Sequence, residues 1–89
     1  MPSVRIPPPY RGPTLGAAEI RAEGETVGVV LDWVERKFPG FLAQVLDEDG
    51  NVHGFVKLFK NGEHLVRDPL RTPLAEGDDL EIIAAIAGG

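Results

Sequence analysis

The chain of 89 residues ends in two glycines, Gly88 and Gly89, and this terminus is the part of the sequence best suited to chemistry. A C-terminal carboxylate is ionised at neutral pH, so it is a poor electrophile until an enzyme activates it, for example as an acyl-adenylate. Glycine has no Cβ, so its backbone can approach other groups closely and adopt unusual torsion angles. The pattern indicates a terminus that enters the closed site of a partner enzyme and is activated at the Gly89 carbonyl carbon.

The residues before Gly89 form a narrow lead to this terminus, and we expect Ile86, Ala87 and Gly88 to thread into the partner's site. The six residues from Ala84 onward can span roughly 20 Å when extended. We therefore divide the chain into a domain over residues 1–85 and a flexible tail over residues 86–89. Chance is the alternative: with glycine at about 7% of residues, two terminal glycines occur in roughly one chain in 200.

Composition excludes several classes of function. The chain has no cysteine, which excludes disulfides, thiolate metal sites and a catalytic thiol of its own. The net charge of −5 disfavours nucleic acid as a partner and agrees better with steering toward a basic protein surface. There is no apolar run of membrane-spanning length and no signal-peptide pattern in residues 1–10, so we expect a cytoplasmic protein without a membrane partner.

One amphipathic helix is predicted after Thr26, whose hydroxyl suits the N-cap position. Pro39-Gly40 ends the helical pattern. Between these limits, apolar residues recur at the spacings that place them on one buried stripe of a helix. They are Val27, Val30, Leu31, Val34 and Phe38.

Strands are predicted on both sides of this helix in the sequence. Asn61-Gly62 joins two of them as a type I′ hairpin turn, since both residues tolerate positive φ. One helix can cover one face of one sheet, so the predicted fold is a two-layer α+β domain with a mixed sheet of four to five strands. The predicted strands are residues 3–7, 18–22, 55–60, 64–67 and 79–85.

The two faces of the predicted sheet cannot both meet the helix. Successive strand residues point to opposite faces, so Ile82 and Ile83 face opposite sides, and Leu58 and Phe59 do the same. The open face therefore keeps apolar residues, which either loops or terminal residues cover or a partner contacts. We take Phe59 and Ile83 as candidate docking residues.

The remaining candidates for chemistry are weaker. His53 and His64 have no evident acid–base partner, so we expect them to be surface or turn residues. Asp47, Asp49 and Asn51 follow half of a calcium-loop pattern, but the required spacing and terminal glutamate are missing, which favours a turn. No metal site is predicted.

The order and spacing of these pieces resemble the MoaD/ThiS sulfur carriers, which share the β-grasp fold of ubiquitin. The resemblance covers nearly the whole chain, and it is strongest toward the MoaD-like and cysteine-pathway, CysO-like, members. The segments that carry it are Val4-Arg5-Ile6-Pro7, Thr26-Val27-Gly28, Leu46-Asp47-Glu48-Asp49-Gly50, Phe55-Val56, Asn61-Gly62-Glu63, Thr72-Pro73-Leu74, Glu76-Gly77-Asp78 and Ile86-Ala87-Gly88-Gly89.

The resemblance implies a mechanism in which the chain is a protein cosubstrate and not an enzyme. A MoeB/ThiF-like adenylyltransferase would adenylate Gly89 with ATP and magnesium, and the chain itself would bind no cofactor. A sulfurtransferase or desulfurase would then supply sulfur to form a Gly89 thiocarboxylate. A downstream enzyme would accept this sulfur in molybdopterin or cysteine synthesis, or in thiamine synthesis or transfer-RNA thiolation. The chain could also be the small subunit of a molybdopterin synthase-like complex.

Two other functions fit the same sequence. A protein modifier would join the Gly89 carboxyl to a lysine of another protein after the same activation step. A non-catalytic interaction domain would have the same fold and an inert terminus. The sequence does not separate these readings, nor does it name the receiving pathway.

Overall fold

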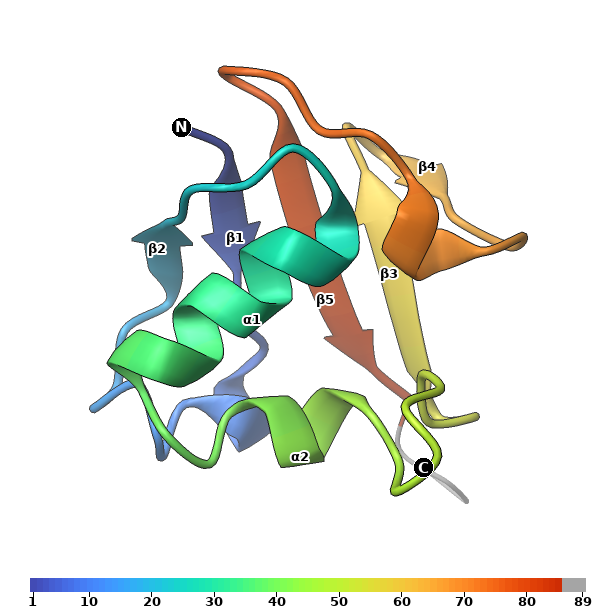
Figure 1. The fold of residues 1–89 in the computed structure, drawn as a ribbon. Coiled ribbons are helices and arrows are strands. Elements are labelled where there is room, and N and C mark those ends of the chain that lie inside the picture. The colour runs from blue at the N-terminus through green and yellow to red at the C-terminus, as the bar shows by residue number, and fades with distance from the viewer. Residues whose placement is uncertain (86–89) are drawn as a thin grey trace.

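The computed structural model describes residues 1–85, which form a mixed sheet with one main helix across one face (Figure 1). The sheet order is β2-β1-β5-β3-β4. The central strands β1 and β5 are parallel, and every other neighbouring pair is antiparallel. This arrangement confirms the predicted two-layer α+β domain. The strands are β1 (Ser3–Arg5), β2 (Glu19–Arg21), β3 (Val56–Lys60), β4 (Glu63–His64) and β5 (Asp79–Ala84).

The main helix α1 spans Val27–Lys37 and begins where the sequence predicts. Thr26 has extended backbone angles, and its Oγ1 accepts a hydrogen bond of 3.3 Å from the amide of Val29. This bond satisfies one of the free amides of the first helical turn. The predicted stripe lies against the sheet, since Val27, Val30, Leu31 and Val34 are fully buried.

Replacing Thr26 by alanine is expected to lower the free energy of unfolding by about 1 kcal/mol, because the cap is lost while the helix stays packed. Urea denaturation followed by circular dichroism measures this change. Thr26→Ser keeps the acceptor oxygen and is expected to retain most of the stability. Equal losses in the two variants would show that the threonine methyl group, and not the cap, is what matters.

The core fills the space between α1 and one face of the sheet. On the sheet side it is formed by Val4, Leu58, Leu80 and Ile82, which are at most 2% exposed. A short helix, α2 (Leu42–Val45), closes one end together with the fully buried Phe41. Within the described residues, no helix combines the length and apolarity needed to cross a membrane.

Prolines shorten the first strand relative to the prediction. β1 ends at Arg5, although Ile6 still donates a backbone hydrogen bond of 2.8 Å to Ala18. Three consecutive prolines then follow, and proline has no amide hydrogen to continue a ladder. The chain forms a 3₁₀ turn, η1 (Pro8–Tyr10), which places Tyr10 in the core, where burial raises the pKa of its hydroxyl.

The limits predicted for the strand over residues 64–67 were wrong, because β4 spans only Glu63–His64. After β4, Leu65 donates one more backbone hydrogen bond, of 2.8 Å, to Leu58. Asp68 then adopts a left-handed conformation with φ of 40° and leads into a second 3₁₀ turn, η2 (Pro69–Arg71). The pairing with β3 has ended before Val66, so Val66 lies outside the sheet and is 74% exposed.

Candidate functional site

The last strand, β5, carries the chain toward its C-terminus along the middle of the sheet. In residues 1–85, the last backbone contact along this strand is a 2.7 Å hydrogen bond from the amide of Ala85 to the carbonyl oxygen of Phe55. Figure 1 shows this end of β5 beside the segment that precedes β3. The predicted reactive residue Gly89 and the predicted threading residues Ile86, Ala87 and Gly88 lie beyond this bond, outside the described residues.

Side chains alternate along β5 as the sequence predicts. Leu80 and Ile82 face α1 and are buried, whereas Ile83 points to the open face of the sheet and is 37% exposed. On β3, Leu58 is buried and Phe59 lies on the opposite face, half-buried.

The two candidate docking residues therefore share one face of the sheet. In the ladder between β3 and β5, Lys57 pairs with Ile83 and Phe59 pairs with Glu81, so Phe59 and Ile83 are diagonal neighbours. The ring of His64 stacks on Phe59 with centroids 5.0 Å apart. We call Phe59 and Ile83 the open-face patch.

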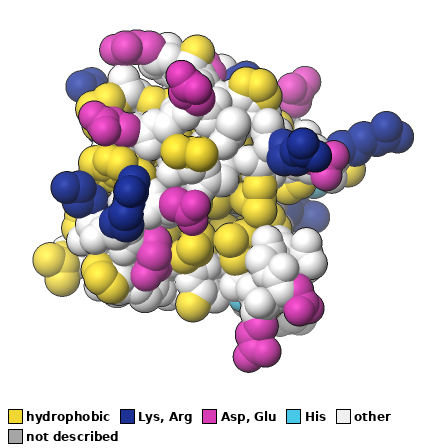
Figure 2. All heavy atoms as spheres, in the orientation of Figure 1, with side chains coloured by type: hydrophobic (Ala, Val, Ile, Leu, Met, Phe, Trp, Pro, Cys, Tyr) yellow, Lys and Arg dark blue, Asp and Glu magenta, His cyan; other side chains and the backbone are white. Residues whose placement is uncertain are grey.

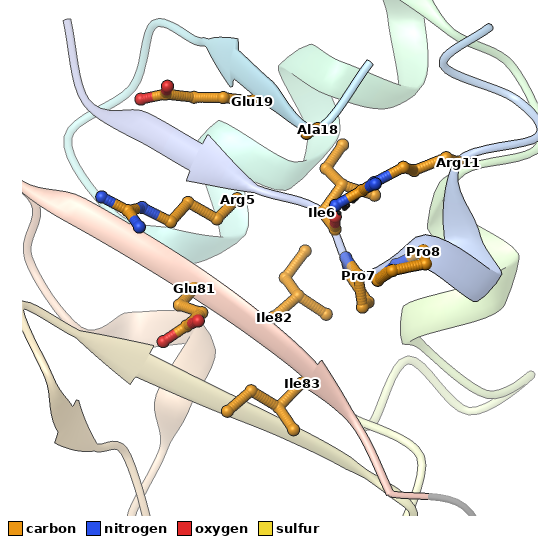
Figure 3. Close-up of a pocket in the computed structure, with 10 residues that line it drawn as sticks. All are labelled: Arg5, Ile6, Pro7, Pro8, Arg11, Ala18, Glu19, Glu81, Ile82 and Ile83. Atoms are coloured by element: carbon orange, nitrogen blue, oxygen red, sulfur yellow. Dashed lines mark hydrogen bonds between the residues drawn. The ribbon is translucent and has the colours of Figure 1, made fainter. Parts of the chain in front are cut away.

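Charged residues occupy the rest of this face. Arg5 in β1 pairs with Glu19 in β2 on one side and with Glu81 in β5 on the other. Its Nε also donates a 3.0 Å hydrogen bond to Asp79, and this contact raises the pKa of the guanidinium. Figure 3 shows Arg5, Glu19 and Glu81 around a hollow of about 440 Å³ that extends to Ile83. Arg5 is thus surrounded by three carboxylates, those of Glu19, Glu81 and Asp79, so this part of the face is acidic. The open-face patch is the apolar part of the same surface.

The side of the molecule that carries α1 has a mixed surface. On the side with α1, acidic, basic and hydrophobic side chains are mixed across the surface (Figure 2). On the open face, Ile83 and Phe59 pair with Lys57 and Glu81, and Ile83 lies near the end of β5.

A polar cluster holds the other end of β5. The carboxylate of Asp78 accepts hydrogen bonds of 2.7 Å from the amide of Ala75 and 3.0 Å from the side-chain amide of Asn61. The Oδ1 of Asn61 also accepts a 2.8 Å hydrogen bond from the amide of Asp79, and the Nζ of Lys60 lies 3.8 Å from a carboxylate oxygen of Asp78. The predicted type I′ hairpin is confirmed by φ of 49° at Asn61 and 87° at the next residue. The side chain of Asn61 also anchors the start of β5, a role that the hairpin motif alone does not indicate.

Asp78 is expected to make stability depend on pH in acid. Hydrogen bonds from Ala75 and Asn61, and the charge of Lys60, hold the pKa of Asp78 below its ordinary value of 3.8. The unfolded chain therefore takes up this proton first, so the stabilisation is present above about pH 4 and is lost as pH falls through the folded-state pKa. In urea denaturation, Asp78→Asn should be less stable than wild type near neutral pH and lose less stability on acidification. Parallel losses in the two proteins would contradict this role.

The other predicted features are structural. The Oδ1 of Asp47 accepts from the amides of Asp49 at 2.9 Å and Asn51 at 3.0 Å, which confirms a turn in place of a calcium loop. In residues 1–85, no group of three or more potential ligands from His, Cys, Asp and Glu could hold a metal ion. His53 is half-buried, and its ring stacks on Phe55 with centroids 4.9 Å apart.

Comparison with known proteins places this domain in a family. The ThiS family matches residues 11–89. The sulfur carrier protein CysO of Mycobacterium tuberculosis is 33% identical over 98% of this chain and 97% of its own. Small archaeal modifier protein 3 of Haloferax volcanii is 42% identical over 72% of this chain and 70% of its own.

Solved structures agree with this match. One chain of the crystal structure of the Amycolatopsis orientalis BexX/CysO complex superposes on this domain with a TM-score of 0.91. The two sequences are 34% identical, and the match covers 100% of both chains. Both comparisons confirm the ubiquitin-like β-grasp fold and the family resemblance read from the sequence. The chain belongs to the ThiS family and is a ubiquitin-like sulfur carrier.

Proposed function

We propose that Gly89 is the reactive residue of this carrier and that a MoeB/ThiF-like adenylyltransferase activates it with ATP and magnesium. A carboxylate oxygen of Gly89 attacks the α-phosphorus of ATP, and pyrophosphate leaves. The resulting mixed anhydride makes the Gly89 carbonyl carbon electrophilic, which the free carboxylate is not. The observation that carries this proposal is the Gly88-Gly89 terminus in a chain that matches the ThiS family through residue 89.

Sulfur then has to come from another protein, because the chain has no cysteine. The terminal sulfur of a persulfide on a sulfurtransferase or desulfurase attacks the Gly89 carbonyl carbon, and AMP leaves. A second thiol cleaves the resulting acyl disulfide, forming a disulfide with the donor and releasing the Gly89 thiocarboxylate. The carrier thus acts as a protein cosubstrate that delivers sulfur to a downstream enzyme.

The relatives favour cysteine synthesis as the receiving pathway. CysO proteins match this chain over nearly its full length, both in sequence and in structure. We therefore place cysteine synthesis ahead of molybdopterin synthesis as the destination of the sulfur. Loading the carrier and offering it to a sulfide-accepting cysteine synthase would test this order, with formation of cysteine as the readout.

The open-face patch is the proposed docking surface for the adenylyltransferase. Phe59 and Ile83 lie on the two strands that lead to the C-terminal end of the domain, so a partner bound there would also receive the terminus. A related CysO is known in complex with BexX, which supports a carrier that binds a second protein through a folded surface. Aromatic side chains such as that of Phe59 are enriched at the cores of protein interfaces.

Intact mass spectrometry tests the activation step directly. The purified chain is incubated with a candidate adenylyltransferase, ATP, magnesium and sulfide. The expected product is heavier by the mass difference between sulfur and oxygen, and fragmentation places the change at Gly89. The reaction without ATP is the control. Absence of this product with every adenylyltransferase encoded in the same genome would contradict the proposal.

Conjugation to proteins is a second candidate, favoured by the similarity to a small archaeal modifier protein. Here the activated Gly89 carbonyl is attacked by a lysine amine in place of sulfur. Trypsin cuts after Arg71, so a modified lysine would carry residues 72–89 as a branched remnant. Finding this remnant on other proteins of the native cell would support conjugation, and it does not exclude sulfur transfer.

A further inference from the structure

We propose that His53 is a positioning residue that fixes Ala85, the last residue that the structure describes. This inference rests on the proposed activation of Gly89 and concerns how the terminus is presented to the partner. His53 lies in the segment between α2 and β3, outside the open-face patch. Its sequence surroundings indicate no catalytic role, so its contacts are the evidence.

The His53 side chain makes two contacts, one through a ring nitrogen and one through a face of the ring. Its Nε2 lies 3.1 Å from the carbonyl oxygen of Ala43 in α2, and because a carbonyl only accepts, Nε2 carries the hydrogen. Its ring stacks on Phe55 with centroids 4.9 Å apart and planes 13° from parallel. The side chain therefore ties α2 to Phe55.

The backbone of His53 strengthens the same link. Its amide donates a 3.0 Å hydrogen bond to the carbonyl oxygen of Val45 at the end of α2. Its carbonyl oxygen accepts a 3.0 Å hydrogen bond from the amide of Val56 at the start of β3. The neighbouring Gly54 is exposed, and a Cβ placed there would meet nothing within 4 Å. The turn at residues 53–55 is thus held mainly by the contacts of His53.

Phe55 connects this turn to the C-terminal end of the domain. Its carbonyl oxygen accepts the 2.7 Å hydrogen bond from Ala85, the residue that follows β5. The Phe55 ring is 48% exposed, so burial alone does not fix it, and the His53 ring covers one of its faces. The contacts form a continuous path from α2 through His53 and Phe55 to Ala85.

This path matters because only residues 86–88 separate Ala85 from Gly89. A partner that docks on the open-face patch needs the Gly89 carboxylate at a defined place, and a misplacement of about 1 Å can cost roughly a hundredfold in rate. Loosening Ala85 would make the starting position of the terminus less defined while leaving Phe59 and Ile83 in place. The effect should fall on kcat and not on KM.

Hydrogen exchange tests the path without any partner. In His53→Ala, the Ala85 amide should exchange about tenfold faster than in wild type, because the bond to Phe55 opens more often. His53→Phe keeps a ring to stack on Phe55 and should restore part of the protection. Unchanged exchange at Ala85 in His53→Ala would overturn the inference. His53→Phe also provides the comparison if the alanine variant folds poorly, since it should then still exchange faster than wild type.

Loading kinetics test the consequence. His53→Ala should lower kcat for adenylation about tenfold and change KM less than about twofold. Ile20→Val is the control, because it slightly destabilises β2 at the other edge of the sheet and should leave both constants unchanged. Equal loss of kcat in the control would mean that stability, and not position, is responsible, and would overturn the inference. Failure of the wild-type chain to load would count against the proposed function alone, since exchange at Ala85 tests the path by itself.

Discussion

Deletion of Gly89 is expected to abolish sulfur loading while leaving the folded domain unchanged. The truncated chain still ends in a glycine carboxylate, but that carboxylate is one residue short, which is about 3.3–3.6 Å in an extended chain. Displacement of a reacting group by this distance removes the effective concentration that the partner's site provides. The buried core that we describe is formed by residues up to Ala84, so the thermal unfolding midpoint should not move.

Two matched variants sharpen this result. Gly89→Ala keeps the chain length and the carboxylate, so it should load slowly but measurably, with a Cβ hindering close approach. A chain with one extra residue after Gly89 should not load until a protease removes that residue. Intact mass spectrometry measures loading, and circular dichroism on heating measures stability. Loading of the deletion variant at the wild-type rate would show that the position of the carboxylate is not decisive.

The same variants separate the possible functions. Sulfur transfer and protein conjugation both need an activated Gly89, so both fail in the deletion and in the extended chain. A non-catalytic interaction domain would keep its function with a residue added after Gly89. The cellular phenotype of the extended chain, with protease cleavage excluded by mass spectrometry, therefore distinguishes a reactive terminus from an inert one.

Local signals in the sequence predicted most of the elements. Thr26 and the apolar stripe after it were sufficient for α1, because an N-cap and a helical period are properties of consecutive residues. Asn61-Gly62 was sufficient for the hairpin turn, because both residues must tolerate positive φ. Strand limits were less secure: the hairpin turn predicted a returning strand, but β4 spans only Glu63–His64 and not residues 64–67.

The pairing of strands that are far apart in the sequence could not be predicted from local signals. β1 lies beside β5 although their residues are more than seventy positions apart in the sequence, as the pairing of Ser3 with Asp79 shows. Alternation along each strand predicted which residues share a face, and so the open-face patch could be proposed, but the ladder that makes Phe59 and Ile83 neighbours is a tertiary fact.

His53 escaped prediction for a related reason. With no acid–base partner evident in the sequence, His53 is predicted only as a surface or turn residue. Its contacts are instead a carbonyl oxygen on α2 and the ring of Phe55 two residues ahead, and their importance appears only when Ala85 is seen to bond to Phe55. One local signal could have indicated this turn: His53 and Phe55 stand on either side of Gly54, just before β3.

Ile83→Asp is expected to weaken binding of the adenylyltransferase by about 30-fold or more. This factor corresponds to the loss of roughly 2 kcal/mol that marks a central interface residue. Ile83 is 37% exposed on the open face, so the change should cost the free domain little stability. Phe59→Ala, on the neighbouring strand, should act in the same direction. Steady-state adenylation measured by pyrophosphate release should show a raised KM.

Val66→Asp is the matched control for this docking prediction. It makes the same change from an apolar side chain to a carboxylate at a residue that is 74% exposed but lies beyond the sheet. It should leave KM unchanged, whereas an equal rise would mean that added negative charge, and not the open-face patch, weakens binding. Because the patch acts on binding and Gly89 acts on the reacting carbon, Ile83→Asp should be rescued by raising the carrier concentration and the Gly89 deletion should not. That difference separates the surface that brings the two proteins together from the atom on which they act.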